Sequence, residues 1–319
     1  MCFCVPLLLL CYADELKKRD YYGLVKQQVE QMYEQSEGKR VTLVAHSMGG
    51  PVSLYFLDTE NGIVTQDWKD KHLHAYVTLS GAWGGSPLTV REIISGYSLG
   101  LPSIIGKILE PIFRPISRTQ ESGVWLFPDP YVFKSTKIVT TPKKNYTAND
   151  YESLFDDIEY KLGYSMYEGT EKINKSFPGP KVRTHCYWGL GTQTPLTYHY
   201  DTEFPVDAGH NPSKTDYSDG DGRVNNITSV VCLKWADTVE NKTFHGVKHG
   251  DMIKSYSVFD AIAKVVTNLT AESKFQPKPL DESDKHEGGM FTDKMYRHFP
   301  TYRAIKNVIR KMVQMMVRI

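Results

Sequence analysis

The sequence lacks a strong excess of charge of either sign. Its 38 lysines and arginines nearly balance its 37 aspartates and glutamates, and the formal net charge is +1. Proteins that bind nucleic acid neutralise its phosphates with a basic surface, and no nucleic-acid-binding motif occurs in this sequence. The composition therefore gives no reason to expect nucleic acid as a partner.

Internal repeats and long apolar runs are also missing. The apolar run from Cys2 to Tyr12 is too short to span a bilayer, which takes about 20 residues. It has the length of a signal-peptide core, with Ala13 as a small residue before a cut at Asp14, although it lacks the usual basic start. We predict that residues 1–13 are a signal-like apolar segment, and the alternative is a buried strand at the beginning of the chain.

Cysteine is scarce outside that segment. Three of the five cysteines lie in the apolar run, and only Cys186 and Cys232 lie in the body of the chain, where they are sufficient for one disulfide. The sequence also holds Asn-X-Ser/Thr sequons, which are glycan acceptors in a secreted chain. The sequons begin at Asn145, Asn174, Asn226, Asn241 and Asn268. Together they favour the secretory route.

What the sequence does contain is a nucleophile elbow between Val41 and Leu57. Strand-forming residues run into Ala45-His-Ser-Met-Gly49, and an apolar helical pattern follows. In an elbow the serine occupies a strained strand-to-helix turn, so small residues are needed two positions before and after it. Ser47 is therefore the predicted nucleophile, and the backbone N–H of Met48 is the predicted oxyanion donor.

Helical and strand patterns alternate around the elbow. Apolar residues recur at helical spacing after Asp20, a helix-capping residue, and Gly38 is a stop signal. A strand is expected at 75–79, before a glycine-rich turn, and sheet signals return at 182–188. A further helix is expected over 252–266. This order favours a parallel sheet.

Two stretches depart from the alternation. Residues 86–177 are rich in aromatics and prolines, with an apolar patch at 99–109, and predict a cap or lid insertion over the active site. We expect a partial α/β-hydrolase domain over 14–275, then a polar linker and basic amphipathic tail over 276–319. The tail helix at 302–319 packs on its own protein or lies on an anionic membrane, and packing is the commoner use.

A serine hydroxyl needs a histidine to take its proton and an acid to orient that histidine. In α/β-hydrolases the three follow in the order Ser, Asp, His. Asp221 lies in a DGDG turn and His249 lies in a glycine-flanked turn just before a helical pattern. Because catalytic side chains are concentrated in such loops, these two are the predicted acid and base.

Other residues compete for these roles. Asp219 lies two positions from Asp221, His245 lies four before the predicted base, and His46 is adjacent to the serine. The DGDG run also raises a calcium site, but an EF-hand loop would need an acid and a glutamate where Arg223 and Val230 stand. No metal site is expected.

Several motifs stand in order along the chain: AHSMGG at 45–50, AWGG at 82–85, NYT at 145–147, YWGLGTQTP at 187–195 and DGDGRVN at 219–225. Together they resemble those of the lecithin:cholesterol acyltransferase family, and most closely its lysosomal phospholipase/transacylase branch. The likeness covers about residues 20–269.

The resemblance implies an α/β-hydrolase in which Ser47 is the nucleophile, Asp221 the acid and His249 the base. It implies a disulfide between Cys186 and Cys232, and a cap and lid over a track for lipid acyl chains. The implied reaction is attack of the serine on a glycerophospholipid ester, with transfer of the acyl group to water or a lipid alcohol. No cofactor is implied. The implied setting is a membrane or lipoprotein surface, in the lysosome or outside the cell.

The sequence departs from the family at its beginning. Family members carry, upstream of the elbow, a strand with a Pro-Gly loop that supplies the second oxyanion N–H, and then a disulfide-bearing membrane-binding region. Only about 40 residues precede Val41 here, so we expect an α/β-hydrolase whose N-terminal strands are missing. Losing one oxyanion donor typically costs about 10²- to 10³-fold in rate. The rival hypotheses are a catalytically impaired fragment or pseudoenzyme that binds lipid, and a carboxylesterase for small esters.

Overall fold

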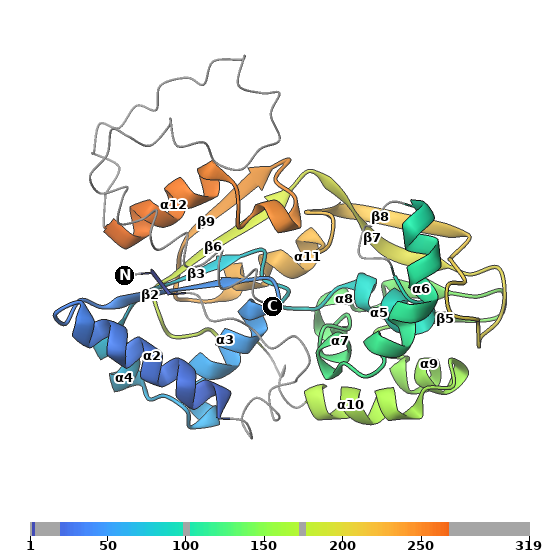
Figure 1. The fold of residues 1–319 in the computed structure, drawn as a ribbon, viewed down its shortest axis with the longest axis horizontal. Helices are drawn as coiled ribbons and strands as arrows, with labels where there is room; N and C mark the ends of the chain where they lie inside the picture. Colours follow the sequence, from blue (N-terminus) through green and yellow to red (C-terminus); the bar gives the residue numbers. More distant parts are fainter. Residues whose placement is uncertain (1, 4–19, 98–102, 172–176, 268–319) are drawn as a thin grey trace, which may run out of the picture.

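The strand that leads into the elbow lies inside a five-stranded parallel sheet (Figure 1). The computed structural model describes residues 2–3, 20–97, 103–171 and 177–267. The strand order is β1-β2-β3-β6-β9, and every neighbouring pair is parallel. The strands are β1 (Cys2–Phe3), β2 (Val41–His46), β3 (Leu73–Leu79), β6 (Thr184–Leu190) and β9 (Thr238–His245). The predicted α/β class with a mostly parallel sheet is confirmed.

The beginning of the chain contributes the edge strand of this sheet. Cys2 and Phe3 of β1 pair with Thr42 and Leu43 of β2. These two residues form a strand, as in the alternative prediction for the apolar segment. Residues 4–19 lie outside the described part of the chain.

Helices cover both faces of the sheet, which makes three layers. Because successive side chains of a strand point to opposite faces, β2 sends Leu43 and Ala45 into one core and Val44 into the other. The first face is covered by α2 (Tyr21–Gln35), α3 (Gly49–Leu57) and α4 (Gln66–His72), with a short 3₁₀ turn at Thr59–Asn61. The second face is covered by α12 (Tyr256–Thr267).

The predicted helix after Asp20 is present as α2. Tyr22, Val25 and Val29 form its buried stripe, and Gly38 takes a positive φ of 78° just beyond it. Asp20 precedes the helix, but its side chain makes no capping hydrogen bond.

The helix predicted over 252–266 is shorter at its start. Residues 252–254 form a turn, and α12 begins at Tyr256.

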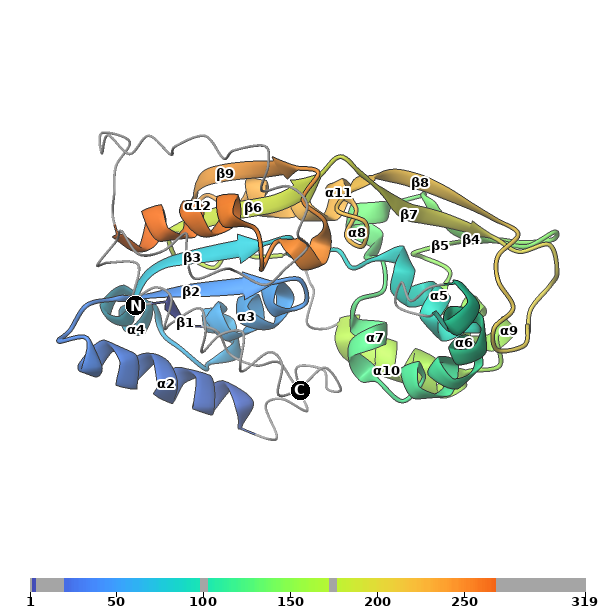
Figure 2. The ribbon, with the colours of Figure 1, turned by 45° about the horizontal axis from the view of Figure 1, so that its top comes forward.

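A second body stands beyond the carboxyl ends of the parallel strands (Figure 2). Its helices come from the predicted insertion. They are α5 (Pro87–Ser95), α6 (Ser103–Ser117), α7 (Glu121–Trp125), α8 (Pro130–Phe133), α9 (Tyr151–Asp157) and α10 (Lys161–Glu171). Its core contains stacked aromatic side chains, for example Phe127 and Phe155, whose ring centroids lie 5.3 Å apart.

This body has a sheet of its own, in the order β5-β4-β7-β8. β4 (Lys137–Thr140) and β5 (Asn145–Thr147) belong to the predicted insertion. β7 (Thr192–His199) and β8 (Lys214–Gly220) form a hairpin that follows β6 and lies outside it. The cap is therefore built from two separate parts of the chain, and the second part leads directly into the DGDG turn.

Among the described residues, no helix is both long and apolar enough to cross a membrane. The predicted tail over 276–319, with its amphipathic helix, lies outside them.

Candidate active site

Ser47 occupies a sharp turn between β2 and α3. Its φ is 55°, a left-handed conformation that is strained for a residue with a side chain. The turn is held by the Ser47 N–H, which donates to the Leu79 carbonyl at 3.0 Å, and by the Gly50 N–H, which donates back to the Ser47 carbonyl at 2.9 Å. The strained turn points the hydroxyl beyond the carboxyl end of the sheet.

Small residues line this turn, as the elbow pattern predicts. A Cβ added at Gly49 would lie 3.9 Å from that of Ala45, an ordinary contact distance, so the two small residues face each other. The tighter position is Gly50, where a Cβ would lie 3.0 Å from the ring of Trp83. A side chain at Gly50 would therefore push α3 away from the turn that follows β3.

Asp221 is held by the turn that follows β8. Its side chain is almost fully buried, and Oδ1 accepts the backbone N–H groups of Arg223 at 3.0 Å and Val224 at 2.8 Å. A Cβ at Gly189 of β6 would lie 2.9 Å from the Asp221 Cβ, so glycine there lets the acid turn approach the sheet.

His249 lies between the acid and the serine. It begins a 3₁₀ turn, η3 (His249–Asp251), after β9, and its N–H donates to the Asp221 carbonyl at 2.9 Å. Nδ1 lies 2.8 Å from Asp221 Oδ2, and Nε2 lies 2.8 Å from Ser47 Oγ. The structure thus joins the three predicted residues in one chain of hydrogen bonds, although Ser47 and His249 are 202 positions apart in the sequence.

The surroundings keep this acid ionised. Burial by itself would raise the pKa of Asp221, but hydrogen bonding and charge interaction with His249 outweigh it, and the N–H groups of Val224 and Arg223 act in the same direction. The pKa of Asp221 therefore falls below the ordinary carboxyl value. An ionised acid can accept the Nδ1 proton and leave Nε2 free to take the proton of Ser47.

His46, one of the competing histidines, lies against His249 and is not part of the hydrogen-bond chain from Ser47 to Asp221. Its Nε2 lies 3.0 Å from the His249 carbonyl oxygen, and the two rings lie 4.6 Å apart. Burial and the neighbouring His249 lower the pKa of His46 to about 3, so it stays neutral and donates that hydrogen bond.

The other competitors lie outside the hydrogen-bond chain. Asp219 Oδ1 accepts the N–H groups of Gly191 at 2.8 Å and Gly220 at 2.7 Å, so its role is to hold the turn. His245 is exposed at the end of β9.

The backbone N–H of Met48 is available for an oxyanion. Within the described residues, no protein acceptor lies within hydrogen-bond distance of it. It precedes the first turn of α3, where unpaired N–H groups and the helix dipole favour negative charge.

The AWGG turn joins the site to the cap by backbone packing. The Gly84 N–H donates to Thr228 Oγ1, and a Cβ at Gly84 would lie 2.7 Å from Val132 of α8. Ser86 then caps α5 and donates its hydroxyl to the Arg223 carbonyl at 2.6 Å. Gly84 therefore allows the turn to lie close against the cap, whereas the sequence predicted glycines here for the approach of a ligand or for a sharp turn.

Two charged residues beside the site were not singled out from the sequence. Arg223 follows the acid inside the DGDGR motif and is exposed, and Glu92 lies half-buried on α5. The positive charge of Arg223 acts on both Glu92 and His46. In the sequence, Arg223 was considered only as a residue that does not fit a calcium-binding loop. Its positive charge next to Asp221 could have marked it as a residue of the site.

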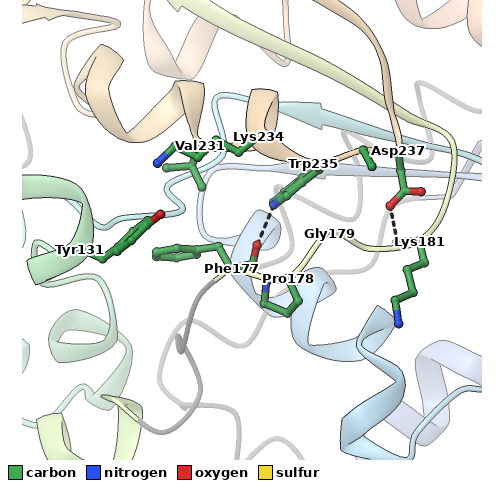
Figure 3. Close-up of a pocket in the computed structure, with 10 residues that line it drawn as sticks. Tyr131, Phe177, Pro178, Gly179, Lys181, Val231, Lys234, Trp235 and Asp237 are labelled. Atoms are coloured by element: carbon green, nitrogen blue, oxygen red, sulfur yellow. Dashed lines mark hydrogen bonds between the residues drawn. The ribbon is translucent and has the colours of Figure 1, made fainter.

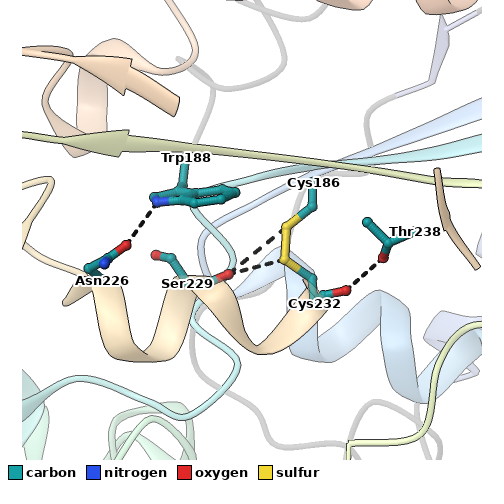
Figure 4. The surroundings of a disulfide bond; sticks show 6 residues. All are labelled: Cys186, Trp188, Asn226, Ser229, Cys232 and Thr238. Carbon is teal, nitrogen blue, oxygen red and sulfur yellow. Dashed lines mark hydrogen bonds between the residues drawn. A yellow bond between two sulfur atoms is a disulfide. The ribbon is translucent and has the colours of Figure 1, made fainter. Parts of the chain in front are cut away.

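Cys186 and Cys232 form a disulfide with a Cα–Cα distance of 6.4 Å (Figure 4). It joins β6 to η2 (Val230–Lys234), which continues from α11 (Asn226–Ser229) after the acid turn. The Cys232 carbonyl also accepts the hydroxyl of Thr238 at 2.6 Å. The bond therefore fixes the segment that follows the acid relative to the sheet.

The sequons differ in accessibility. Asn145 and Asn241 are exposed, whereas Asn226 is half-buried and its Oδ1 accepts Trp188 Nε1 at 3.0 Å. Asn174 and Asn268 lie outside the described residues.

A cavity of about 410 Å³ lies between the cap and the sheet domain (Figure 3). Its walls include Tyr131, Phe177 and Trp235, whose Nε1 donates to the Phe177 carbonyl at 2.9 Å. Lys234 lies over the Tyr131 ring at 4.7 Å from its centroid, and Lys181 stands at the opposite side. None of the described residues lining this cavity belongs to the Ser47 hydrogen-bond chain.

Over the same described ranges, no group of three or more His, Cys, Asp or Glu side chains is placed to hold a metal.

The chain is similar to enzymes that act on phospholipids. It is 39% identical over 216 residues to a lysosomal phospholipase A and acyltransferase of Bos taurus, covering 67% of this chain and 50% of that protein. The Homo sapiens protein of the same name is 34% identical, covering 77% and 58%. A phosphatidylcholine-sterol acyltransferase of Gallus gallus is 32% identical, covering 74% and 55%.

The chain thus spans about half the length of the curated relatives it matches. Among solved structures, the Tle4-Tli4 complex contains a similar chain at a TM-score of 0.45 and 13% identity, covering 78% of this chain and 63% of that one. The family model of lecithin:cholesterol acyltransferase matches residues 12–263. This match covers most of the sequence, and the chain therefore belongs to the lecithin:cholesterol acyltransferase family.

Proposed function

We propose that this protein is a serine-dependent lipid acyl hydrolase and O-acyltransferase. The observation that carries the proposal is the hydrogen-bond chain from Ser47 through His249 to Asp221, with 2.8 Å at each step. An unrelated serine and histidine have no reason to meet in this geometry beside a buried acid and an unpaired N–H. The four groups together suit acyl transfer.

In the proposed mechanism, Ser47 Oγ attacks the ester carbonyl carbon while His249 Nε2 takes the hydroxyl proton. Asp221 keeps the imidazole oriented and stabilises its positive charge. The carbonyl oxygen becomes an oxyanion that accepts the N–H of Met48. The intermediate collapses to an acyl-serine, and the leaving alcohol takes the proton from His249.

The second half repeats these steps with a new acceptor. Water or a lipid alcohol attacks the acyl-serine, gives its proton to His249 and leaves with the acyl group as a fatty acid or a new ester. Every proton and electron pair is supplied by the substrates and the three side chains, so the reaction requires no metal or organic cofactor.

We infer that the acyl donor is a glycerophospholipid. Membership of the family and the names of the relatives support this substrate class. A substrate of this kind is met at a membrane or lipoprotein surface. The disulfide and the exposed sequons at Asn145 and Asn241 support a secretory route to the lysosome or the outside of the cell.

The test replaces the nucleophile. Ser47→Ala should remove release of fatty acid from phosphatidylcholine and also remove covalent labelling by a fluorophosphonate. Ser257→Ala, which changes an exposed serine on α12, is the matched control and should retain both. Labelling that persists in Ser47→Ala would assign the nucleophile elsewhere. A wild-type chain that neither labels nor hydrolyses would favour the pseudoenzyme hypothesis.

A further inference from the structure

The turn that carries the base is joined to the elbow by a hydrogen bond that the acyl-transfer steps do not use. It comes from His46, the last residue of β2, whose Nε2 lies 3.0 Å from the carbonyl oxygen of His249. A carbonyl oxygen can only accept, so Nε2 of His46 must carry the hydrogen and donate it. The side chain that precedes the nucleophile is therefore a hydrogen-bond donor to the backbone of the base.

The other contacts of His249 lead mainly to the acid turn. Its N–H donates to the Asp221 carbonyl at 2.9 Å, and Nδ1 lies 2.8 Å from Asp221 Oδ2. Within the described residues, two hydrogen bonds join residues 248–252 to the elbow at 46–50. One links His249 Nε2 to Ser47 Oγ, and the other is the bond from His46.

The first of these two bonds is lost during the proposed reaction. Ser47 Oγ gives its proton to His249 and then carries the acyl group, so this oxygen no longer has a hydrogen to donate. The bond from His46 uses no reacting atom and is still made at this stage. The base must stay within reach of the incoming acceptor during this interval, because a misplacement of about 1 Å can cost about 10²-fold in rate.

His46 holds the base without adding charge. Its ring lies 4.6 Å from the ring of His249, at an angle of 39° between the planes. Burial and then the neighbouring His249 lower the pKa of His46 to about 3, with Arg223 acting in the same direction and Asp221 in the opposite one. A second imidazolium here would repel the positive charge that His249 acquires from the proton of Ser47. A neutral donor does not oppose that charge.

We propose that His46 is a positioning residue, which keeps His249 against the elbow while the acyl group is on Ser47. The inference rests on the proposed function, because it concerns the base of that reaction. During formation of the acyl-serine, the hydroxyl of Ser47 also holds the base. During its removal, that second bond is absent. Loss of the His46 donor therefore slows the removal of the acyl group more than its formation.

His46→Phe tests this order, because phenylalanine keeps an aromatic ring beside His249 and loses the donor. With p-nitrophenyl hexanoate, we expect kcat to fall about 10- to 100-fold. KM should fall with it, so that kcat/KM, which reports formation of the acyl-serine, changes less. An equimolar burst of p-nitrophenol should appear, and mass spectrometry should detect the hexanoyl-enzyme.

A conservative variant and a control complete the series. His46→Gln can place an amide N–H near the position of the imidazole Nε2, so it should restore kcat to within about threefold of the wild type and remove the burst. His245→Phe, which changes an exposed histidine at the end of β9, is the control and should behave as the wild type.

Two kinetic outcomes would overturn the inference. One is an equal fall of kcat and kcat/KM in His46→Phe without a burst, which indicates general structural damage. The other is a failure of His46→Gln to restore kcat. Neither outcome affects the proposed function, which depends on turnover by the wild type and its loss in Ser47→Ala.

Proton NMR tests the positioning without turnover. The His249 Nδ1–H, assigned by its loss in Asp221→Asn, should give a low-field resonance in the wild type and in Ser47→Ala. Adding His46→Phe to Ser47→Ala removes both bonds to the elbow, so exchange with water should broaden this resonance beyond detection. Adding His46→Gln instead should retain it. An unchanged resonance in the variant with phenylalanine would overturn the inference.

The NMR result also separates the two hypotheses if the wild type is inactive. The expected pattern of resonances without turnover would support the positioning role of His46 and refute the proposed function. A wild type with neither the resonance nor turnover would overturn both.

Discussion

Asp221→Asn is the sharpest test of the hydrogen-bond chain, because asparagine has the same shape and loses only the charge and one acceptor. The wild-type Oδ1 accepts two backbone N–H groups, from Arg223 at 3.0 Å and Val224 at 2.8 Å, and Oδ2 faces His249 Nδ1 at 2.8 Å. If the asparagine oxygen keeps the two N–H groups, its NH₂ group must face His249.

That arrangement fixes the wrong tautomer. Nδ1 of His249 then accepts a hydrogen bond, so the proton moves to Nε2, which can no longer take the proton of Ser47. The opposite amide orientation would set the NH₂ group against two backbone donors in a buried site, which costs more. We therefore expect kcat to fall by about 10⁴-fold, or about 5 kcal/mol of transition-state stabilisation.

The matched control is Asp219→Asn, two residues away. Asp219 accepts the N–H groups of Gly191 and Gly220, and an asparagine oxygen can still accept both, so kcat should stay within about threefold of the wild type. The assay is the kcat for p-nitrophenyl hexanoate, with circular dichroism to verify that each variant is folded. If Asp219→Asn is the more damaging variant, the assignment of the acid and the tautomer argument are both refuted.

Two further changes test the frame around the site. In Gly189→Ala the added Cβ would lie 2.2 Å from the Val247 carbonyl oxygen and 2.9 Å from the Asp221 Cβ, so the change should lower stability by about 1–3 kcal/mol in urea unfolding and also lower kcat. Gly123→Ala is the control and should do neither, because its Cβ would lie 3.8 Å from its nearest contact. Equal effects of the two alanines would contradict the close packing of β6 against Val247 and the acid turn. Replacing Cys186 and Cys232 by serine should lower the free energy of unfolding by about 4 kcal/mol, the entropy of closing a loop with a sequence separation of 46. Non-reduced peptide mapping should find the bridge in the wild type, and two free thiols would speak against both the bridge and the secretory route.

Much of the nucleophile side of the site is predictable from the sequence. The elbow is encoded within a few residues, because a buried strand, small residues at Ala45 and Gly49 and an apolar helix are enough to specify the turn at Ser47. The helix at α2 and the parallel class of the sheet follow from the same kind of local pattern. The motifs also indicated which later turns to consider for the acid and the base.

The cap was only partly predictable. Residues 86–177 stood out by their composition, but the hairpin of β7 and β8 did not, because Pro195 and a polar, half-exposed pattern hide its strands. Its membership in the cap sheet depends on the pairing of Val139 with Tyr198, far apart in the sequence, and such pairings leave no local signal.

By itself, then, the sequence determined the elements around the elbow and pointed to Ser47 as the candidate nucleophile, because these depend on contacts between near neighbours in the chain. Only the tertiary structure shows which of the competing acids and histidines hydrogen-bond to one another, since Asp219 and Asp221 have the same chemistry and differ only in the direction the turn gives them. It also brought Ser86 of the cap to the carbonyl oxygen of Arg223 in the acid turn, a contact between two segments that no local pattern specifies. The sequence shows which residue types are present. Which of these side chains contact one another depends on where the strands of the two sheets end.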